Sequence, residues 1–388
     1  MRGVRSEGVG ERLFSDGEMH RRRAAIGAVL EDAGVPYALV YGANRSGSAV
    51  SWLTDWPVTR EALLVLGPDA ADDVLLVSFY NHLPQARRLA RTRTEWAGER
   101  TVTTAVRFIE DRVGRLERVG VVGQIPFDQY RVLAGWAGSV VDLNPAYTTL
   151  RLIKSDEEIT ALRRAAALTD AAVAALVDNV RIGISEHELL ARLELAYAAR
   201  GGMRHIGYLA TTSMDDPSVC VPGQWPTARG VRAGDVVLTE ISAAVAPEYA
   251  GQLLRTCTVA AEPTSLYAEM HAVAMAAFEA VSGRLVPGTV SSDLAAAGSL
   301  IEESGFTMVD DLVHGFGGGY LPPVIGGSTR RLAPSPDLVL AAGMTVVVQP
   351  NVVTPDGRAG VQTGELLLVT DNGAERLHAF PPGLQVLG

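Results

Sequence analysis

The chain of 388 residues contains only two cysteines, Cys220 and Cys257, and a single lysine, Lys154. Two cysteines cannot build a disulfide framework, so the sequence favours a reducing compartment. No apolar run approaches the roughly 18 residues of a membrane-spanning helix, and the first residues include no apolar signal segment. We therefore expect a soluble, cytoplasmic protein without a membrane partner.

Basic residues are also outnumbered, with 34 Lys and Arg against 44 Asp and Glu and a formal net charge of −10. This balance argues against nucleic-acid partners, because phosphate backbones attract basic surfaces. With one lysine, a Schiff-base mechanism has a single candidate. The chain is 47% hydrophobic and 20% charged, which excludes disorder and is enough for two domains with large cores.

The first 150 residues alternate strand and helix patterns. Short β-branched and leucine-rich runs predict strands, and apolar residues at helical spacing predict helices between them. The predicted strands are 37–41, 62–66, 74–77, 120–123 and 140–143, and the predicted helices are 18–33, 82–92, 105–116 and 127–136. The chain then turns at residues 144–145. This alternation indicates an α/β N-terminal domain over residues 1–150.

Residues 151–388 have a different pattern, typical of an α+β domain. Ser155 with Glu158, and Ser185 with Glu188, form capping boxes that predict helices to about residues 180 and 200. Later helices are predicted at 266–281 and 292–304, and strands at 235–240, 252–260, 344–349, 351–353 and 365–370. The repeated order of helices and strands indicates paired helices beside an antiparallel sheet.

Seven segments of this second region resemble, in order and spacing, the motifs of the creatinase, prolidase and aminopeptidase P superfamily. They are 151–159, 183–186, 234–240, 249–256, 313–317, 343–350 and 366–373, and residues 51–57 resemble an N-terminal segment of the same family. The resemblance implies a pita-bread C-terminal domain after a creatinase-like N-terminal α/β domain. It also implies a homodimer, in which Trp52, Trp56 and Arg60 are candidates for reaching the neighbouring site.

The metallopeptidases of that superfamily hold two divalent ions with two aspartates, one histidine and two glutamates. The matching positions here are Glu240, Gln252, His314, Gln349 and Gly364. Neutral amides bind such ions far less well than carboxylates, and two ions would leave uncompensated charge in a buried site. We therefore expect no metal and no cofactor. The resemblance then points to the metal-free branch that includes creatinase and ectoine hydrolase.

That branch implies hydrolysis of a C–N bond in a small, amino-acid-derived substrate. His314 is the acid/base candidate because imidazole titrates near neutrality. Glu240 would anchor a cationic group, orient His314, or simply pair with Arg255. Cys220 is the candidate nucleophile, with a buried structural thiol as the alternative. Residues 220–224 contain no counterpart of the branch's upstream catalytic histidine, so creatinase activity itself is not expected.

Five further residues form the predicted substrate-binding set: Gln252, Gln349, Tyr320, Arg255 and Glu365. The two amides would donate hydrogen bonds to an oxyanion or carboxylate, or merely fill the former metal space. Tyr320 stands in a Gly-Tyr-Leu-Pro-Pro segment that resembles a loop of ectoine hydrolases. Strand alternation turns Glu365 away from the site unless a bulge intervenes. Arg255 would otherwise support the site from behind.

Two other functions remain open at this point. One is a non-catalytic descendant that binds a ligand in the same pocket. The other is an Xaa-Pro peptidase with atypical metal ligands, recruited from Asp235, Asp310, Asp311 and Glu365. Residues 215–225 have the composition of a loop and are a candidate lid.

Overall fold

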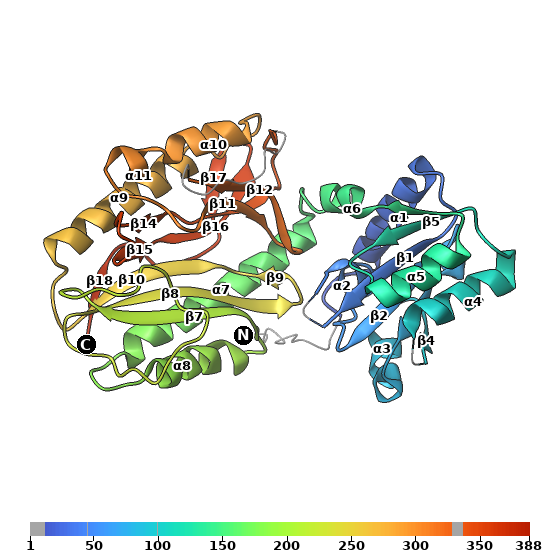
Figure 1. Cartoon of the computed structure of the whole chain (residues 1–388), viewed down its shortest axis with the longest axis horizontal. Helices are drawn as coiled ribbons and strands as arrows, with labels where there is room; N and C mark the ends of the chain where they lie inside the picture. The colour runs from blue at the N-terminus through green and yellow to red at the C-terminus, as the bar shows by residue number, and fades with distance from the viewer. Residues whose placement is uncertain (1–11, 45, 99, 328–336) are drawn as a thin grey trace, which may run out of the picture. The chain divides into compact units, whose positions relative to one another are not determined.

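The computed structural model describes residues 12–44, 46–98, 100–327 and 337–388. The chain forms two compact units, Met1–Arg151 and Leu152–Gly388 (Figure 1). Within the described residues, no helix has the length and apolar character needed to cross a membrane.

The first unit is built on a mixed six-stranded sheet in the order β4-β3-β2-β1-β5-β6. Its strands are β1 (Ala38–Ala43), β2 (Glu61–Leu66), β3 (Val74–Val77), β4 (Arg93–Trp96), β5 (Arg118–Val122) and β6 (Ser139–Asp142). Its helices are α1 (Asp16–Asp32), α2 (Ala49–Thr54), α3 (Leu83–Leu89), α4 (Thr101–Val113), α5 (Phe127–Trp136) and α6 (Asn144–Leu150), with 3-10 turns at Ala70–Asp72 and Tyr80–His82. This is the predicted α/β architecture.

Three short elements of this unit lie outside the sequence prediction. Strand β4 forms the edge of the sheet through its parallel pairing with β3. Helix α2 ends at Thr54 and so includes only the first four residues of the segment 51–57, which resembles a family motif. Helix α6 begins where only a turn was expected, since proline is tolerated in the first turn of a helix.

The expectation that Trp52 and Trp56 reach a neighbouring site is wrong, because both side chains are buried within their own unit. The Trp52 ring packs edge-on against Tyr147, and the Trp52 carbonyl accepts a hydrogen bond from the buried Arg22. Arg60 is exposed, with its guanidinium over the ring of Phe79. The tryptophans therefore serve the core of the first unit.

The second unit is a curled ten-stranded sheet with the main order β12-β11-β13-β16-β10-β8-β7. These strands are β7 (Met203–Ser213), β8 (Asp235–Ala246), β10 (Leu253–Val259), β11 (Asp311–Phe316), β12 (Tyr320–Gly326), β13 (Thr345–Val348) and β16 (Gly364–Thr370). Strands β9 (Tyr249–Ala250), β17 (Gly373–Arg376) and β18 (Gln385–Leu387) pair with β8, β16 and β10. A separate hairpin joins β14 (Asn351–Val353) and β15 (Gly360–Gln362).

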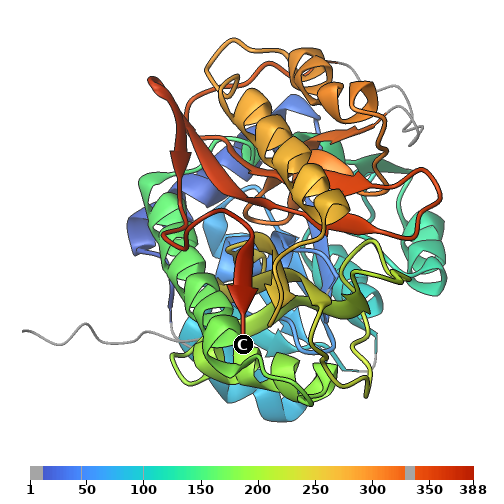
Figure 2. The same ribbon diagram turned by 90° about the vertical axis from the view of Figure 1, so that its left-hand side faces the viewer.

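Helices cover the two halves of this sheet (Figures 1 and 2). Helices α7 (Asp156–Asn179) and α8 (Glu186–Ala198) pack on the half formed by β7 and β8. Helices α9 (Ser265–Ser282), α10 (Ser291–Gly298) and α11 (Leu300–Glu303) belong to the other half, where α9 packs on β14 and β15 and α10 on β11 and β12. Both predicted capping boxes are present. Each half thus has its own apolar core.

The loop between β7 and β8 is fixed by the buried carboxylate of Glu186 at the start of α8. One carboxylate oxygen accepts hydrogen bonds from the backbone and hydroxyl of Thr211, each at 2.7 Å. The other accepts from the backbone and hydroxyl of Thr227, at 2.7 and 2.8 Å. Four bonds on one carboxylate hold this loop against the sheet, which matters for the pocket described next.

Candidate active site

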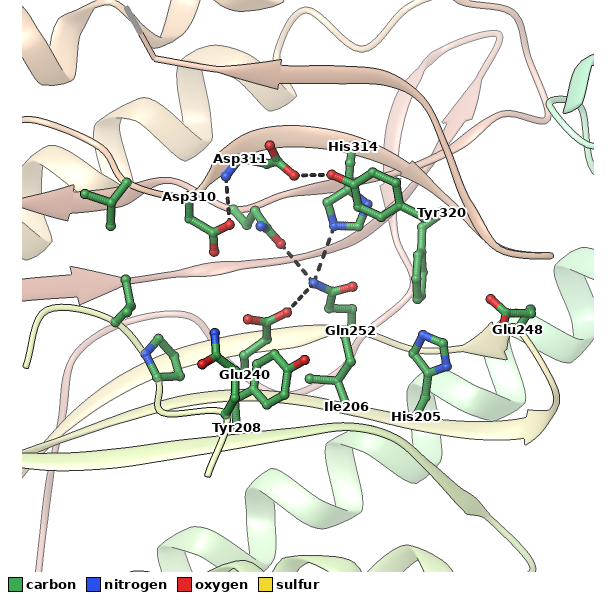
Figure 3. Close-up of a pocket in the computed structure, with 16 residues that line it drawn as sticks. His205, Ile206, Tyr208, Glu240, Glu248, Gln252, Asp310, Asp311, His314 and Tyr320 are labelled. Atoms are coloured by element: carbon green, nitrogen blue, oxygen red, sulfur yellow. Dashed lines mark hydrogen bonds between the residues drawn. The ribbon is translucent and has the colours of Figure 1, made fainter. Parts of the chain in front are cut away.

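A cavity of about 420 Å³ lies within the second unit, at the meeting of its two half-sheets. Five of the predicted site residues line it: Glu240, Gln252, His314, Tyr320 and Gln349 (Figure 3). They come from β8, the residue before β10, β11, the start of β12 and the residue after β13. The volume suits a small molecule.

The side-chain amide of Gln252 lies at the centre of this group. Its Nε2 atom donates one hydrogen bond to Glu240 Oε1 and another to Gln349 Oε1, both at 2.9 Å. The same nitrogen lies 3.5 Å from His314 Nε2. Because an amide nitrogen carries two hydrogens, the two oxygen acceptors use both of them. Gln252 therefore ties three strands together at the site.

His314 is buried and has the electrostatics of a neutral imidazole. Burial lowers its pKa to about 4. Its Nδ1 lies 3.2 Å from the carbonyl of Gly315, to which it donates, and its ring stacks on Tyr320 at 4.5 Å between centroids. A neutral imidazole that donates from Nδ1 keeps a lone pair on Nε2. That lone pair faces the amide of Gln252.

The carboxyl group of Glu240 is shifted in the opposite direction. Burial, reinforced by the nearby charge of Asp310, raises its pKa to about 8. Near neutral pH the group is therefore mostly protonated. An acid with a raised pKa beside a base with a lowered pKa is the arrangement in which each group remains available for proton transfer.

The region from Asp310 to Tyr320 completes the wall of the pocket. Tyr320 donates its hydroxyl proton to Asp311. Burial, and then the charge of Asp310, raise the pKa of Tyr320 to about 12, so the phenol stays protonated. Asp310 in turn accepts hydrogen bonds from the backbone of Asp311 at 2.8 Å and from Gln362 Nε2 at 2.9 Å.

Comparison with known proteins places this geometry in a family. Residues 160–371 match the model of metallopeptidase family M24, which is more than half of the chain. The chain belongs to metallopeptidase family M24. The predicted membership of the creatinase, prolidase and aminopeptidase P superfamily, with its fold, is thereby confirmed.

Curated M24 relatives include a protein named probable dipeptidase PepE from Mycobacterium tuberculosis, 28% identical over 245 residues. An Xaa-Pro dipeptidase from Pyrococcus furiosus is 25% identical over 229 residues. The first match covers 61% of each chain, and the second covers 59% of this chain and 63% of the relative. The chain therefore matches less than two thirds of the length of these relatives.

Solved structures share the fold over nearly the whole chain. The prolidase from Pyrococcus furiosus superposes with a TM-score of 0.76 and 18% identity, covering 92% of this chain and 99% of that one. The dipeptidase PepE from Mycobacterium ulcerans gives a TM-score of 0.79 and 21% identity, covering 96% and 99%. At these identities the likeness establishes the fold alone.

The donor set of this M24 chain does not fit a pair of divalent ions. Gln252 and Gln349 bring neutral amides, and Gln252 presents hydrogens rather than lone pairs to its neighbours. A Cβ atom added at Gly364 would lie 2.6 Å from the Cα of Gln349 and would collide with the carbonyl of Val348, so this position has no room for a carboxylate. Within the described ranges, no group of three or more His, Cys, Asp or Glu side chains is arranged to hold a metal ion.

Arg255 and Glu365 do not line the pocket, so their placement in the substrate-binding set is wrong. They form a buried ion pair with each other at 2.8 Å, and Arg376 also bonds to Glu365. Burial alone would raise the pKa of Glu365, but the two arginines hold it below its usual value. Strand alternation had predicted that Glu365 points away, and this is confirmed. The suggested pairing of Glu240 with Arg255 is wrong for the same reason.

Cys220 also lies outside the pocket lining, although its neighbours Val221 and Pro222 contribute to it. Its carbonyl accepts a hydrogen bond from Asn351, which holds the backbone of the loop. Burial raises the pKa of its thiol, whereas a nucleophilic cysteine needs a lowered one. The structure therefore corrects the candidate nucleophile to a partly buried structural residue. The predicted lid segment does border the pocket, through Val221, Pro222 and Gln224.

Six pocket residues were not predicted as site candidates from the sequence: His205, Ile206, Tyr208, Glu248, Val309 and Phe316. His205 and Tyr208 come from β7, where a bulge between Arg204 and Ile206 interrupts simple alternation. Glu248 lies in the turn after β8. The one sequence feature that could have indicated Glu248 is its position, as a charged residue directly before a family-like Tyr-x-x-Gln segment.

Proposed function

We propose that this M24 chain hydrolyses a C–N bond of a small, amino-acid-derived substrate without a dinuclear metal centre. Its membership of a peptidase family and the names of its relatives, dipeptidase and Xaa-Pro dipeptidase, support C–N bond hydrolysis. The observation that carries metal independence is the amide of Gln252, which hydrogen-bonds Glu240 and Gln349 at the positions where the family's metallopeptidases hold ions.

His314 and Glu240 supply the proton transfers in this proposal. The lone pair on His314 Nε2 takes a proton from a water molecule as the water oxygen bonds to the substrate carbon. As the C–N bond breaks, protonated Glu240 gives its proton to the departing nitrogen. Exchange with solvent then returns both groups to their starting states. Both lie near a single atom, Gln252 Nε2, so one small substrate can reach both.

The test is turnover by the full-length protein, measured by mass spectrometry on a panel of dipeptides, cyclic amides and amidines, with and without EDTA. We expect EDTA to leave the rate unchanged and His314→Ala to lower it by at least about a hundredfold, as for loss of a general base. His187→Ala, on the exposed surface of α8, is the control.

Three results would overturn the proposal: two tightly held metal ions per chain with EDTA-sensitive turnover, full activity of His314→Ala, or binding of every tested substrate without consumption. The first would establish the Xaa-Pro peptidase with atypical ligands, and the last the non-catalytic descendant. The homodimer and the cytoplasmic location stay predictions; light scattering on the purified protein tests the first.

A further inference from the structure

Glu248 occupies a position where its own backbone is strained. Strands β8 and β9 pair through Ala246 and Tyr249, so Pro247 and Glu248 form a two-residue turn. Proline followed by a residue at positive φ is the pattern of a type II turn, whose second central position is normally glycine. Glu248 has a φ of 67°. A side chain kept in this conformation is a reason to look for a function.

The backbone of this turn is held against the loop that follows His314. Gly318 donates a hydrogen bond to the carbonyl of Glu248 at 2.9 Å. The side chain of Glu248 lines the pocket and lies at the same end as His205 (Figure 3). The turn thus directs a carboxylate to the end of the pocket away from Glu240.

Aromatic rings connect this end to the candidate catalytic residues. Phe316 contacts both His205 and His314 edge-on, with ring centroids 5.6 Å apart in each case. Tyr320 stacks on His314. Burial lowers the pKa of His205, so this imidazole is mostly neutral near pH 7 and does not neutralise Glu248. A carboxylate beside aromatic rings is a setting that attracts organic cations.

One hydrogen-bond acceptor at the centre of the pocket has no donor within the described ranges. Gln252 is 1% exposed, and its Oε1 atom has no hydrogen-bond partner among the described residues. A buried acceptor of this kind costs free energy unless a ligand satisfies it. In the described part of the pocket wall there is no arginine or lysine. The wall thus presents hydrogen-bond acceptors and negative charge to a substrate. Its described residues provide no cationic side chain to bind a carboxylate of the substrate.

We propose that the substrate is a small organic cation whose ammonium or guanidinium group lies beside Glu248, Phe316 and Tyr320, with an N–H of the reacting group directed at Gln252 Oε1. This inference rests on the proposed function and names its substrate class. Glu248 is then a specificity-determining residue, and a free dipeptide with its carboxylate is a poor fit.

The experiment measures binding by calorimetry to two probes of matched shape, 4-guanidinobutyramide and 4-ureidobutyramide. Both carry an uncharged butyramide, and they differ in a guanidinium group against a neutral urea group. The full-length His314→Ala protein is used so that neither probe is consumed. We expect the guanidinium probe to bind at least about tenfold more tightly, the range of one charge-assisted hydrogen bond. Adding Glu248→Gln should reduce the ratio to about one, whereas Glu269→Gln, an exposed change on α9, should leave it unchanged.

Glu248→Gly guards against a folding artefact, because glycine suits this turn and still removes the carboxylate. Equal affinity for the two probes in the protein with Glu248 intact would overturn the inference. A preference for the guanidinium probe that persists in both Glu248→Gln and Glu248→Gly would overturn it as well. The readout is binding, so it is separate from whether His314 catalyses a reaction. If His314→Ala loses turnover but binds the two probes equally, the proposed substrate class is wrong and the hydrolase proposal stands.

Discussion

Gln252 Nε2 donates to Glu240 Oε1 at 2.9 Å, and this bond joins β8 to the start of β10 at the middle of the pocket. The neighbouring bond to Gln349 extends the connection to the end of β13. The site is therefore held together by an amide bridge within the protein. The position of the candidate acid Glu240 therefore depends on Gln252, which takes no part in the proposed proton transfers.

Gln252→Glu should destabilise the protein by about 2 kcal/mol at neutral pH, because it removes both donors and places a carboxylate beside Glu240. Gln85→Glu, an exposed change on α3, should alter the free energy of unfolding by less than about 0.5 kcal/mol. Urea titrations of both variants measure the difference. Equal stability of the two would mean that the bridge contributes little.

The pH dependence of turnover should follow the two shifted groups. The proposed mechanism needs neutral His314, with a pKa of about 4, and protonated Glu240, with a pKa of about 8. We expect kcat/KM to be level between these values and to fall below about pH 4 and above about pH 8. In Glu240→Gln the fall above pH 8 should disappear while the rate drops throughout. An unchanged alkaline limb in that variant would assign it to another group.

Stability should also fall with rising pH because of Glu240. Its pKa is raised from the ordinary 4.5 to about 8, so the folded state binds a proton that the unfolded chain has lost between these values. The stabilisation is complete below pH 4.5 and declines by up to about 1.4 kcal/mol per pH unit toward pH 8. Denaturant titrations from pH 5 to 8 should show a shallower decline for Glu240→Gln. Parallel curves for the two proteins would contradict the shift.

The buried pair of Arg255 and Glu365 should matter far more for stability than an exposed pair. Glu365→Gln leaves the Arg255 charge without its buried partner and should cost about 3 kcal/mol. Glu375→Gln breaks the exposed pair with Arg163 and should cost less than about 1 kcal/mol. Chemical unfolding at one pH compares them directly. Similar costs would show that the buried pair is compensated elsewhere.

Relief of backbone strain offers an independent check on Glu248. Glu248→Gly should raise the free energy of unfolding by about 1 kcal/mol, since a left-handed non-glycine residue costs roughly that much. Ala260→Gly, at a φ of 49° and outside the pocket lining, should give a similar gain. Both are measured by thermal or urea unfolding. A loss of stability in Glu248→Gly alone would mean that the side chain supports the fold.

Much of the fold could be predicted because local signals and tertiary structure agree. The capping boxes at Ser155 and Ser185, and the apolar runs of β3, β8 and β16, fix elements that the core then uses unchanged. Other elements were not predicted, including the 11-residue β7 and the strands β11 and β12. The short β4 and α6 have sequences that are ambiguous until a neighbouring strand or the packing of Tyr147 decides them.

The site was predictable where a family motif marks the position, as for His314, Glu240 and Gln252. It was not predictable where geometry alone decides. The bulge in β7 and the positive φ of Glu248 bring residues into the pocket that no periodicity identifies. The ion pair of Arg255 with Glu365 likewise depends on the register in which β16 pairs with β10. Only the structure could therefore exclude these two residues from substrate contact.

The close approach of Gly364 to β13 limits how this site can be altered. A carboxylate could occupy this position only if the strand beside it moved first, and that movement would disturb Gln349 and the bridge from Gln252. A substitution at Gly364 alone therefore does not supply the carboxylate that a dinuclear metal site would need at this position. Engineering a metal site into this pocket would thus have to begin with the backbone of β13, before any ligand is introduced.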